Sequence, residues 1–184
     1  MYDYIKNSEE KNFALKLIVS DENFILTSRK DNYRDENKSF RLKISKVRRN
    51  STSKIIYHKS LCYYENILEH RWALESGYDS ALFLNERYEA CETSFANIFF
   101  VRDHKIFTPE ISSGLLRGTM RDFLLENFEI SEEKIYAKDL ASFEECFISN
   151  SLMGVRNVKA IDEIKFTGRD KTRDIQEKLK IYGF

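Results

Sequence analysis

Short apolar runs separated by turn residues recur along most of the chain, and this spacing constrains its fold more than any other feature. Runs of this length that are rich in β-branched and aromatic residues predict β-strands. The runs are FALKLIV, NFILTSR, FRLKISKV, SALFL, ANIFFV, KIFT, CFISNS, VKAI and IKF. The first two are separated by SDE, which predicts a hairpin, and ANIFFV and KIFT are separated by the turn RDH. The chain is therefore expected to be built around a sheet.

Three stretches have helical periodicity instead. The first runs from Ser60 to about Ser76 and ends before Gly77, which suits a helix C-terminus. Its apolar stripe consists of Leu61, Tyr64, Leu68 and Trp72. The second runs from about Thr119 to Phe128 after a glycine-bearing loop, and the third is the C-terminal stretch. On the third, the residues that share one side are Ile175, Leu179 and Tyr182. Because the strands outnumber the helices, we expect a mixed α/β (α+β) domain.

The composition predicts one globular domain over residues 1–184. Apolar residues make up 42% of the chain, with 14 Phe and 10 Tyr, which is enough for a sizeable core. No repeat or Pro/Gly/Ser-rich linker marks a boundary. The 30 Lys and Arg residues balance the 30 Asp and Glu residues, so no overall field favours nucleic acid or an anionic membrane as a partner. The basic run RLKISKVRR alternates with apolar residues and is typical of a half-buried strand.

The cysteines indicate a reduced compartment. They are odd in number and far apart, and none has metal-ligand spacing to a histidine, so no metal site is expected. The cysteines are Cys62, Cys91 and Cys146, and the histidines are His58, His70 and His104. The first residues lack an apolar core of secretory length, and no apolar run approaches the length of a membrane span. We therefore expect a soluble, cytoplasmic protein with no membrane partner.

Polar residues that could carry chemistry stand at the ends of the predicted strands. Lys59 lies where a strand or loop leads into the first helix, so it is either a solvated lysine or an amine held at a cofactor. Glu92 precedes an apolar strand, where a buried carboxylate requires a cationic partner. The loop at 114–120 leads into a helix, whose first N–H groups bind either an anion or water. A second loop of small residues, 149–154, ends a later strand.

These pieces resemble one enzyme family. The run from Glu92 to Arg121, ETSFANIFFVRDHKIFTPEISSGLLRGTMR, resembles the signature of the class IV aminotransferases, the fold-type-IV pyridoxal-phosphate enzymes. HKSLCYYENILEHR resembles their cofactor-lysine segment, and CFISNSLMGVRNV resembles their last phosphate-side loop. The resemblance covers about residues 12 to 166. It implies the large C-terminal domain of the D-amino-acid aminotransferase-like fold, a strand-rich pseudo-barrel flanked by helices.

Carried over position by position, the resemblance assigns a role to five residues. Lys59 would attach pyridoxal phosphate covalently and shuttle the α-proton of the substrate. Glu92 would pair with the pyridine nitrogen, which supplies the partner that a buried carboxylate needs. The backbone N–H groups of Thr119 and Met120, together with Ser151, would hold the phosphate.

Other positions are assigned less sharply. Tyr64 lies where aminotransferases place a tyrosine against the phenolic oxygen of the cofactor, or else it belongs to the core. The family loop usually reads Leu-Pro-Gly-Ile-Thr-Arg, whereas this chain has Arg117, Thr119 and Met120, so the threonine hydroxyl is displaced by one residue or lost. Candidates for binding a substrate carboxylate, each of which could equally be solvated, are Arg48, Arg49 and Arg156.

The resemblance implies an enzyme of the aminodeoxychorismate lyase type, which expels pyruvate and leaves 4-aminobenzoate. A branched-chain or D-amino-acid aminotransferase is the near alternative, because both reactions begin with the same proton abstraction. A non-catalytic binding or interaction module is an alternative of another class, because the N-terminal small domain of the family is expected to be absent from this chain. Family members are homodimers, so we expect a C2 dimer that acts on a small amino-acid-like substrate.

Overall fold

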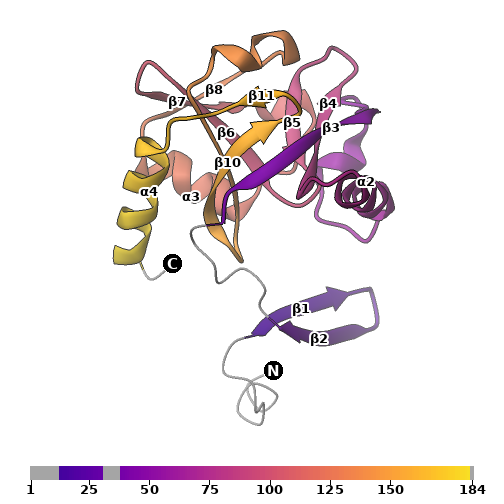
Figure 1. The fold of residues 1–184 in the computed structure, drawn as a ribbon. Helices are drawn as coiled ribbons and strands as arrows, with labels where there is room; N and C mark the ends of the chain where they lie inside the picture. The colour runs from indigo at the N-terminus through magenta and orange to yellow at the C-terminus, as the bar shows by residue number, and fades with distance from the viewer. Residues whose placement is uncertain (1–12, 31–37, 183–184) are drawn as a thin grey trace. The chain divides into compact units, whose positions relative to one another are not determined.

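A two-stranded hairpin lies near the N-terminus of the chain. The computed structural model describes residues 13–30 and 38–182. Strands β1 (Phe13–Val19) and β2 (Phe24–Lys30) pair antiparallel along their whole length. The chain divides into two compact units, residues 1–36 and 37–184, and the hairpin belongs to the first (Figure 1). The hairpin predicted from FALKLIV and NFILTSR is therefore confirmed.

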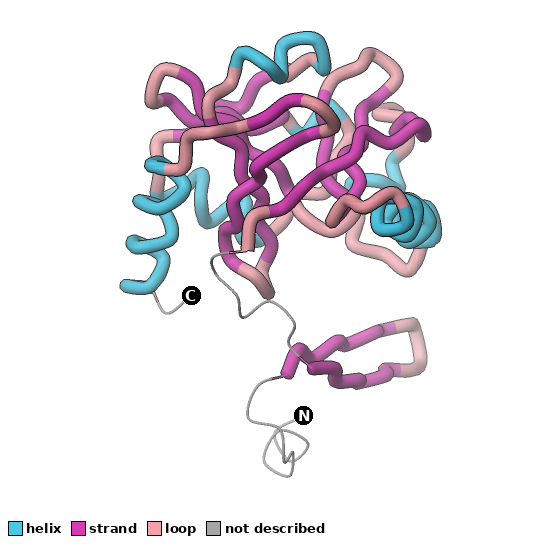
Figure 2. The backbone as a smooth tube through the Cα atoms, viewed as in Figure 1, coloured by secondary structure: helices cyan, strands magenta, loops and turns pink. Residues whose placement is uncertain are grey.

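The second unit is built on a nine-stranded sheet. Its strands are β3 (Phe40–Arg49), β4 (Ser80–Asn85), β5 (Ala90–Thr93), β6 (Asn97–Arg102), β7 (Lys105–Pro109), β8 (Ile130–Glu133), β9 (Glu145–Asn150), β10 (Gly154–Ile161) and β11 (Ile164–Lys165). Along one path the order is β11-β10-β3-β4-β5-β6-β7-β8, and β9 pairs with both β10 and β6. The circuit β3-β4-β5-β6-β9-β10 is thereby closed. Figure 1 shows the strands of this unit between α4 and α2, and Figure 2 shows the same strands in magenta. A closed circuit removes free strand edges, and the predicted strand-rich barrel flanked by helices is confirmed.

Strands β4, β6 and β9 are almost entirely buried, and their sequences are largely apolar. Every residue of β4 and β5 is buried. Phe99 of β6 stacks on Phe147 of β9, with ring centroids 4.7 Å apart. Strands that are covered on both faces have apolar runs instead of alternation. The run ACET is too short and too polar to predict a strand, so β5 is an element that the sequence pattern misses.

Three α-helices lie in the described part of the chain: α2 (Tyr64–Glu75), α3 (Thr119–Asn127) and α4 (Asp170–Ile181). The 3-10 turns are η1 (Lys54–Tyr57), η2 (Ile111–Ser113) and η3 (Ala137–Ser142). Helices α3 and α4 pack on the barrel through one apolar cluster, which includes Met120 and Leu124 of α3 and Phe147 of β9. On α4, Ile175 and Leu179 are buried as predicted, whereas Tyr182 is 55% exposed.

Helix α2 differs from the prediction in its start and in its buried side. It begins at Tyr64 instead of Ser60, because the residues before it form an irregular segment. The residues predicted to share the inner stripe are largely exposed: Leu61 by 69%, Tyr64 by 72% and Leu68 by 43%. The helix buries Asn66 and Ala73 instead. Apolar residues occur on more than one side of α2, so spacing alone could not show which side packs against the barrel.

Two predicted turns are confirmed by their backbone angles. Asp103 and His104, between β6 and β7, have φ values of 51° and 61°. A two-residue hairpin turn of type I′ requires positive φ at both positions. Gly77, with φ of 80°, follows the last turn of α2. Over residues 13–30 and 38–182, no helix is both long enough and apolar enough to cross a membrane.

Candidate active site

A pocket of about 390 Å³ brings together segments that are distant in sequence. Its walls come from the segment before α2, from β5 and β6, from the loop that enters α3, and from the end of β9. Five of the six predicted site residues line it: Lys59, Glu92, Thr119, Met120 and Ser151. Tyr64 is not among the lining residues, because it points to solvent from the first turn of α2. Its neighbour Tyr63 lines the pocket instead.

Lys59 stands on the wall of the pocket formed by the segment between η1 and α2. Its side chain is exposed, and its Nζ lies 5.3 Å from the ring centroid of Tyr63. The Tyr63 hydroxyl donates to the backbone carbonyl of Ser94 at 2.7 Å, which ties this wall to the barrel. An amine with an open approach can react with a carbonyl compound that enters the pocket.

Glu92 is a buried carboxylate on β5 with two fixed neighbours. Its Oε2 accepts a hydrogen bond from the backbone N–H of Leu116 at 3.1 Å. Its Oε1 lies 3.7 Å from Nη2 of Arg49, a buried cation that the sequence analysis considered only for a substrate carboxylate. Burial raises the pKa of Glu92 to about 7, against the lowering effects of Arg49, the Leu116 N–H and Lys59. The carboxylate is therefore poised to gain or lose a proton near neutral pH.

Arg49 is buried between acidic and amide groups. Nη1 donates to Glu65 and Nη2 donates to Asn66 Oδ1, each at 2.8 Å. The guanidinium carbon lies 3.9 Å from the ring centroid of Phe83. Of the three arginines considered for a substrate carboxylate, only Arg49 lines the pocket, and its terminal nitrogens are engaged by the protein. Arg49 is therefore placed to stabilise charge on Glu92.

The start of α3 forms one end of the pocket. Gly118 is the residue before the helix, and no side chain of the described residues caps this N-terminus. The first N–H groups of a helix have no partner within it and favour an anion. Asn97 fixes the loop, because its Nδ2 donates to the Leu116 carbonyl at 2.8 Å. The first turn, with Thr119 and Met120, is thereby presented to the pocket.

The loop that carries Ser151 is held by its own asparagine. Asn150 Oδ1 accepts hydrogen bonds from the N–H groups of Leu152 and Met153, each at 2.9 Å. Its Nδ2 donates to the Phe95 carbonyl at 3.2 Å. Such a turn fixes the direction of the chain. Ser151 therefore stays on the rim of the pocket, where it is exposed.

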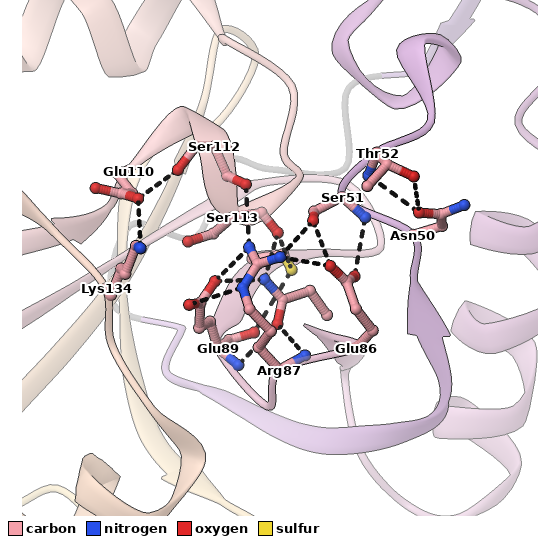
Figure 3. A network of polar contacts seen from close by, with 12 residues as sticks. Asn50, Ser51, Thr52, Glu86, Arg87, Glu89, Glu110, Ser112, Ser113 and Lys134 are labelled. Carbon is pink, nitrogen blue, oxygen red and sulfur yellow. Dashed lines mark hydrogen bonds and ion pairs between the residues drawn. The ribbon is translucent and has the colours of Figure 1, made fainter.

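A polar network fixes the chain on the N-terminal side of Lys59 (Figure 3). Glu86 accepts hydrogen bonds from the backbone N–H and the hydroxyl of Ser51, which lower its pKa to about 2. Arg87 donates to Ser51 Oγ at 2.9 Å and to Glu89 Oε2 at 2.8 Å. The Tyr57 hydroxyl donates to the Ser51 carbonyl at 2.6 Å. The network therefore anchors η1, which leads directly into the segment of Lys59.

Several lining residues were not among the predicted site residues, and Tyr63, Asn97 and Ser149 are three of them. Asn97 was visible in the run ETSFANIFF, but its contact with Leu116 depends on tertiary structure. Ser149 Oγ is buried and has no hydrogen-bond partner among the described residues. An accessible amine, a buried carboxylate and an open helix start suit a ligand with a carbonyl carbon, a basic ring nitrogen and an anionic group. Pyridoxal phosphate has these three features.

Comparisons with known proteins agree with this chemistry. The profile of the family described as amino-transferase class IV matches residues 1–161. The "Probable branched-chain-amino-acid aminotransferase" of Aquifex aeolicus (strain VF5) is 29% identical over 160 residues, which are 83% of this chain and 51% of that protein. The protein of the same name from Rickettsia bellii (strain RML369-C) is 30% identical over 130 residues, 67% of this chain and 45% of that protein. The chain therefore spans about half the length of these curated relatives.

Solved structures share the fold. The "Putative 4-amino-4-deoxychorismate lyase" from Legionella pneumophila is 26% identical with a TM-score of 0.79, over 85% of this chain and 60% of that one. The branched-chain amino acid aminotransferase from Thermobaculum terrenum, solved in its PLP-bound form, is 25% identical with a TM-score of 0.77, over 85% of this chain and 55% of that one. With the family profile matched over residues 1–161, the chain belongs to the class IV aminotransferases, a family whose cofactor is pyridoxal phosphate.

Proposed function

We propose that this chain carries the cofactor site of a pyridoxal-phosphate-dependent enzyme of the 4-amino-4-deoxychorismate lyase type. The observation that carries the proposal is that Lys59, the buried Glu92 and the start of α3 all line the same pocket. The likeness to the Legionella pneumophila structure and the Asn-Ser-Leu-Met-Gly loop support the lyase branch. The reaction would release pyruvate and leave 4-aminobenzoate.

The residues of the pocket would have different tasks. The bound cofactor supplies a ring that draws electrons from the substrate carbon attached to the amine. Lys59 would attach the cofactor through Nζ and, once the substrate amine has replaced it, take the proton from that carbon. Glu92, supported by Arg49, would keep the ring nitrogen protonated. The N–H groups of Thr119 and Met120, with Ser151, would bind the phosphate and fix the ring in the pocket.

An amino-acid aminotransferase is the second candidate, and one observation favours it. The curated relatives in Aquifex aeolicus and Rickettsia bellii carry the name of branched-chain aminotransferases. Lys59 and Glu92 would serve both reactions, so they do not distinguish them. Formation of 4-aminobenzoate and pyruvate from 4-amino-4-deoxychorismate supports the lyase. A keto acid formed from leucine or a D-amino acid, without lyase turnover, supports the aminotransferase.

We also propose a cytoplasmic C2 homodimer. The free thiols of all three cysteines fit a reducing compartment. Helix α2 exposes an apolar stripe at helical spacing, formed by Tyr64, Ile67, Leu68 and Leu74, and exposed apolar patches often mark interfaces. Gel filtration with light scattering at micromolar concentration should show the mass of a dimer, and Leu68→Glu should shift it to the mass of a monomer. A wild-type monomer contradicts the dimer.

The experiment that tests the proposed function asks whether pyridoxal phosphate attaches to Lys59. Purified protein is titrated with pyridoxal phosphate, reduced with borohydride and mapped by peptide mass spectrometry. Wild type and Lys54→Ala, an exposed lysine on η1, should carry the pyridoxyl label on the peptide of residue 59, and Lys59→Ala should not. No visible absorption band, or equal labelling of Lys59→Ala, overturns the proposal and favours a non-catalytic binding or interaction module.

A further inference from the structure

A row of polar residues crosses the floor of the pocket over three neighbouring strands. Glu92 of β5 lies opposite Asn97 of β6, and Asn97 lies opposite Ser149 of β9. Residues that are directly opposite in antiparallel strands share one face of the sheet. All three line the pocket. The row is therefore directed toward whatever the pocket holds.

Two members of the row are already engaged with the loop that enters α3. Glu92 Oε2 accepts a hydrogen bond from the Leu116 N–H at 3.1 Å, and Asn97 Nδ2 donates to the Leu116 carbonyl at 2.8 Å. Both polar groups of one backbone residue are thus bound by neighbouring side chains. This arrangement fixes the loop. It also occupies Glu92 Oε2 and Asn97 Nδ2, so these two atoms have less capacity left to bond a ligand.

Ser149 is the member of the row that is not engaged. Its side chain is fully buried, with an exposed fraction of 0%, and Oγ has no partner in the described ranges 13–30 and 38–182. A buried hydroxyl without a partner destabilises a fold, whereas alanine at the same place carries no such cost. A serine there is explained if a ligand in the pocket completes its hydrogen bonding.

The surroundings of Ser149 indicate which part of a ligand it meets. Asn97, its cross-strand neighbour, lies against Gly118, the residue that precedes the first turn of α3. Ser151, which follows the last residue of β9, also lines the pocket. Ser149 therefore lies at the end of the pocket where α3 begins.

We propose that Ser149 Oγ donates a hydrogen bond to the phosphate of bound pyridoxal phosphate, alongside the N–H groups of Thr119 and Met120. This inference rests on the proposed function and adds to it a buried phosphate contact beside Ser151. It accounts for the unpartnered hydroxyl, since a phosphate oxygen accepts hydrogen bonds from hydroxyl and N–H donors together.

The test compares two cofactor forms that differ only in the phosphate. Dissociation constants for pyridoxal phosphate and for pyridoxal are measured in the Lys59→Ala background by quenching of Trp72 fluorescence, so that covalent attachment does not contribute. Ser149→Ala is expected to weaken the binding of pyridoxal phosphate about tenfold, which corresponds to the loss of one hydrogen bond to a charged group. Binding of pyridoxal should stay unchanged.

Ser113→Ala is the matched control. Ser113 Oγ is also buried without a partner among the described residues, but Ser113 does not line the pocket. Ser113→Ala should therefore leave the dissociation constants of both compounds unchanged. Without ligand, the melting temperature of Ser149→Ala should equal or exceed that of the unmutated protein. If the hydroxyl had a structural role, its removal would lower the melting temperature.

Each outcome decides the matter. Unchanged binding of pyridoxal phosphate to Ser149→Ala overturns the role of Ser149 while the proposed function stands. Equally weakened binding of pyridoxal phosphate and pyridoxal also overturns this role, because the contact of Ser149 would then be to the ring. If the background protein binds neither compound and inorganic phosphate does not raise its melting temperature, both the role of Ser149 and the proposed function fail.

Discussion

Gly118 and Asn97 are packed so closely that a Cβ atom on the glycine would lie 2.3 Å from Asn97 Oδ1. The φ of Gly118 is −79°, which any residue adopts, so the glycine is required by space and not by backbone conformation. Asn97 cannot move away freely, because its Nδ2 is bonded to the Leu116 carbonyl. The contact therefore fixes the distance between the pocket floor and the start of α3.

Substitution of this glycine tests that relationship. Gly118→Ala should displace Asn97, weaken pyridoxal-phosphate binding at least tenfold and lower stability by about 1–3 kcal/mol, the usual cost of overpacking. Fluorescence titration and urea unfolding measure the two effects. Asn97→Ala in the same chain should relieve the clash and recover part of the stability. Gly77→Ala, at φ of 80° with nothing within 4 Å of its Cβ, should lower stability without changing cofactor affinity.

The pH dependence of stability should reveal the buried carboxylate. The pKa of Glu92 is about 7 in the folded chain, above its usual value of 4.5, so the folded state binds this proton more tightly. Protonated Glu92 therefore contributes its full stabilisation to the folded state below a pH of about 4.5, and this contribution is lost as the pH rises through about 7. The loss amounts to roughly 3 kcal/mol for a shift of this size. Glu92→Gln should flatten urea-unfolding stability over this range, and an unchanged slope would contradict a buried, titrating Glu92.

Arg49 should be costly to remove because it is buried among carboxylates. Arg49→Met leaves Glu92 without its cation and should destabilise the cofactor-free protein by about 3 kcal/mol at pH 8. The loss should shrink when Glu92→Gln is added, because the uncompensated charge is then gone. Arg48→Met is the control: Arg48 is the exposed neighbour and should change stability by about 0.5 kcal/mol or less. Equal losses for the two variants would contradict the pairing.

Thiol reactivity should report on the pocket. Cys62 is exposed and lines the pocket, whereas Cys91 and Cys146 are buried and burial raises the pKa of both thiols. A disulfide reagent needs access and thiolate, so the folded protein should react at one thiol and the denatured protein at three. Pyridoxal phosphate should slow the fast reaction, and Cys62→Ser should abolish it. Fast reaction that persists in Cys62→Ser would show that a second thiol is accessible.

Much of the fold could be predicted from local pattern. Apolar runs between turn residues predicted the hairpin β1-β2 and the barrel strands, because strand formation depends on side-chain period and on turn chemistry that nearby residues supply. The strand β5 was missed, because Glu92 and Thr93 interrupt its apolar run. The inner side of α2 was also wrong, because the buried residues Asn66 and Ala73 are neither large nor apolar enough to mark a face.

By itself, the sequence determined the strand-rich fold, the family and the expectation that Lys59 and Glu92 belong to one site. Tertiary structure alone decided that Arg49 is the partner of Glu92, that Tyr63 and not Tyr64 lines the pocket, and that Ser149 is buried without a partner. Periodicity fixes local conformation, whereas burial and pairing depend on which segments the closed barrel brings together. Those contacts join strands that are distant in sequence, and no local pattern encodes them.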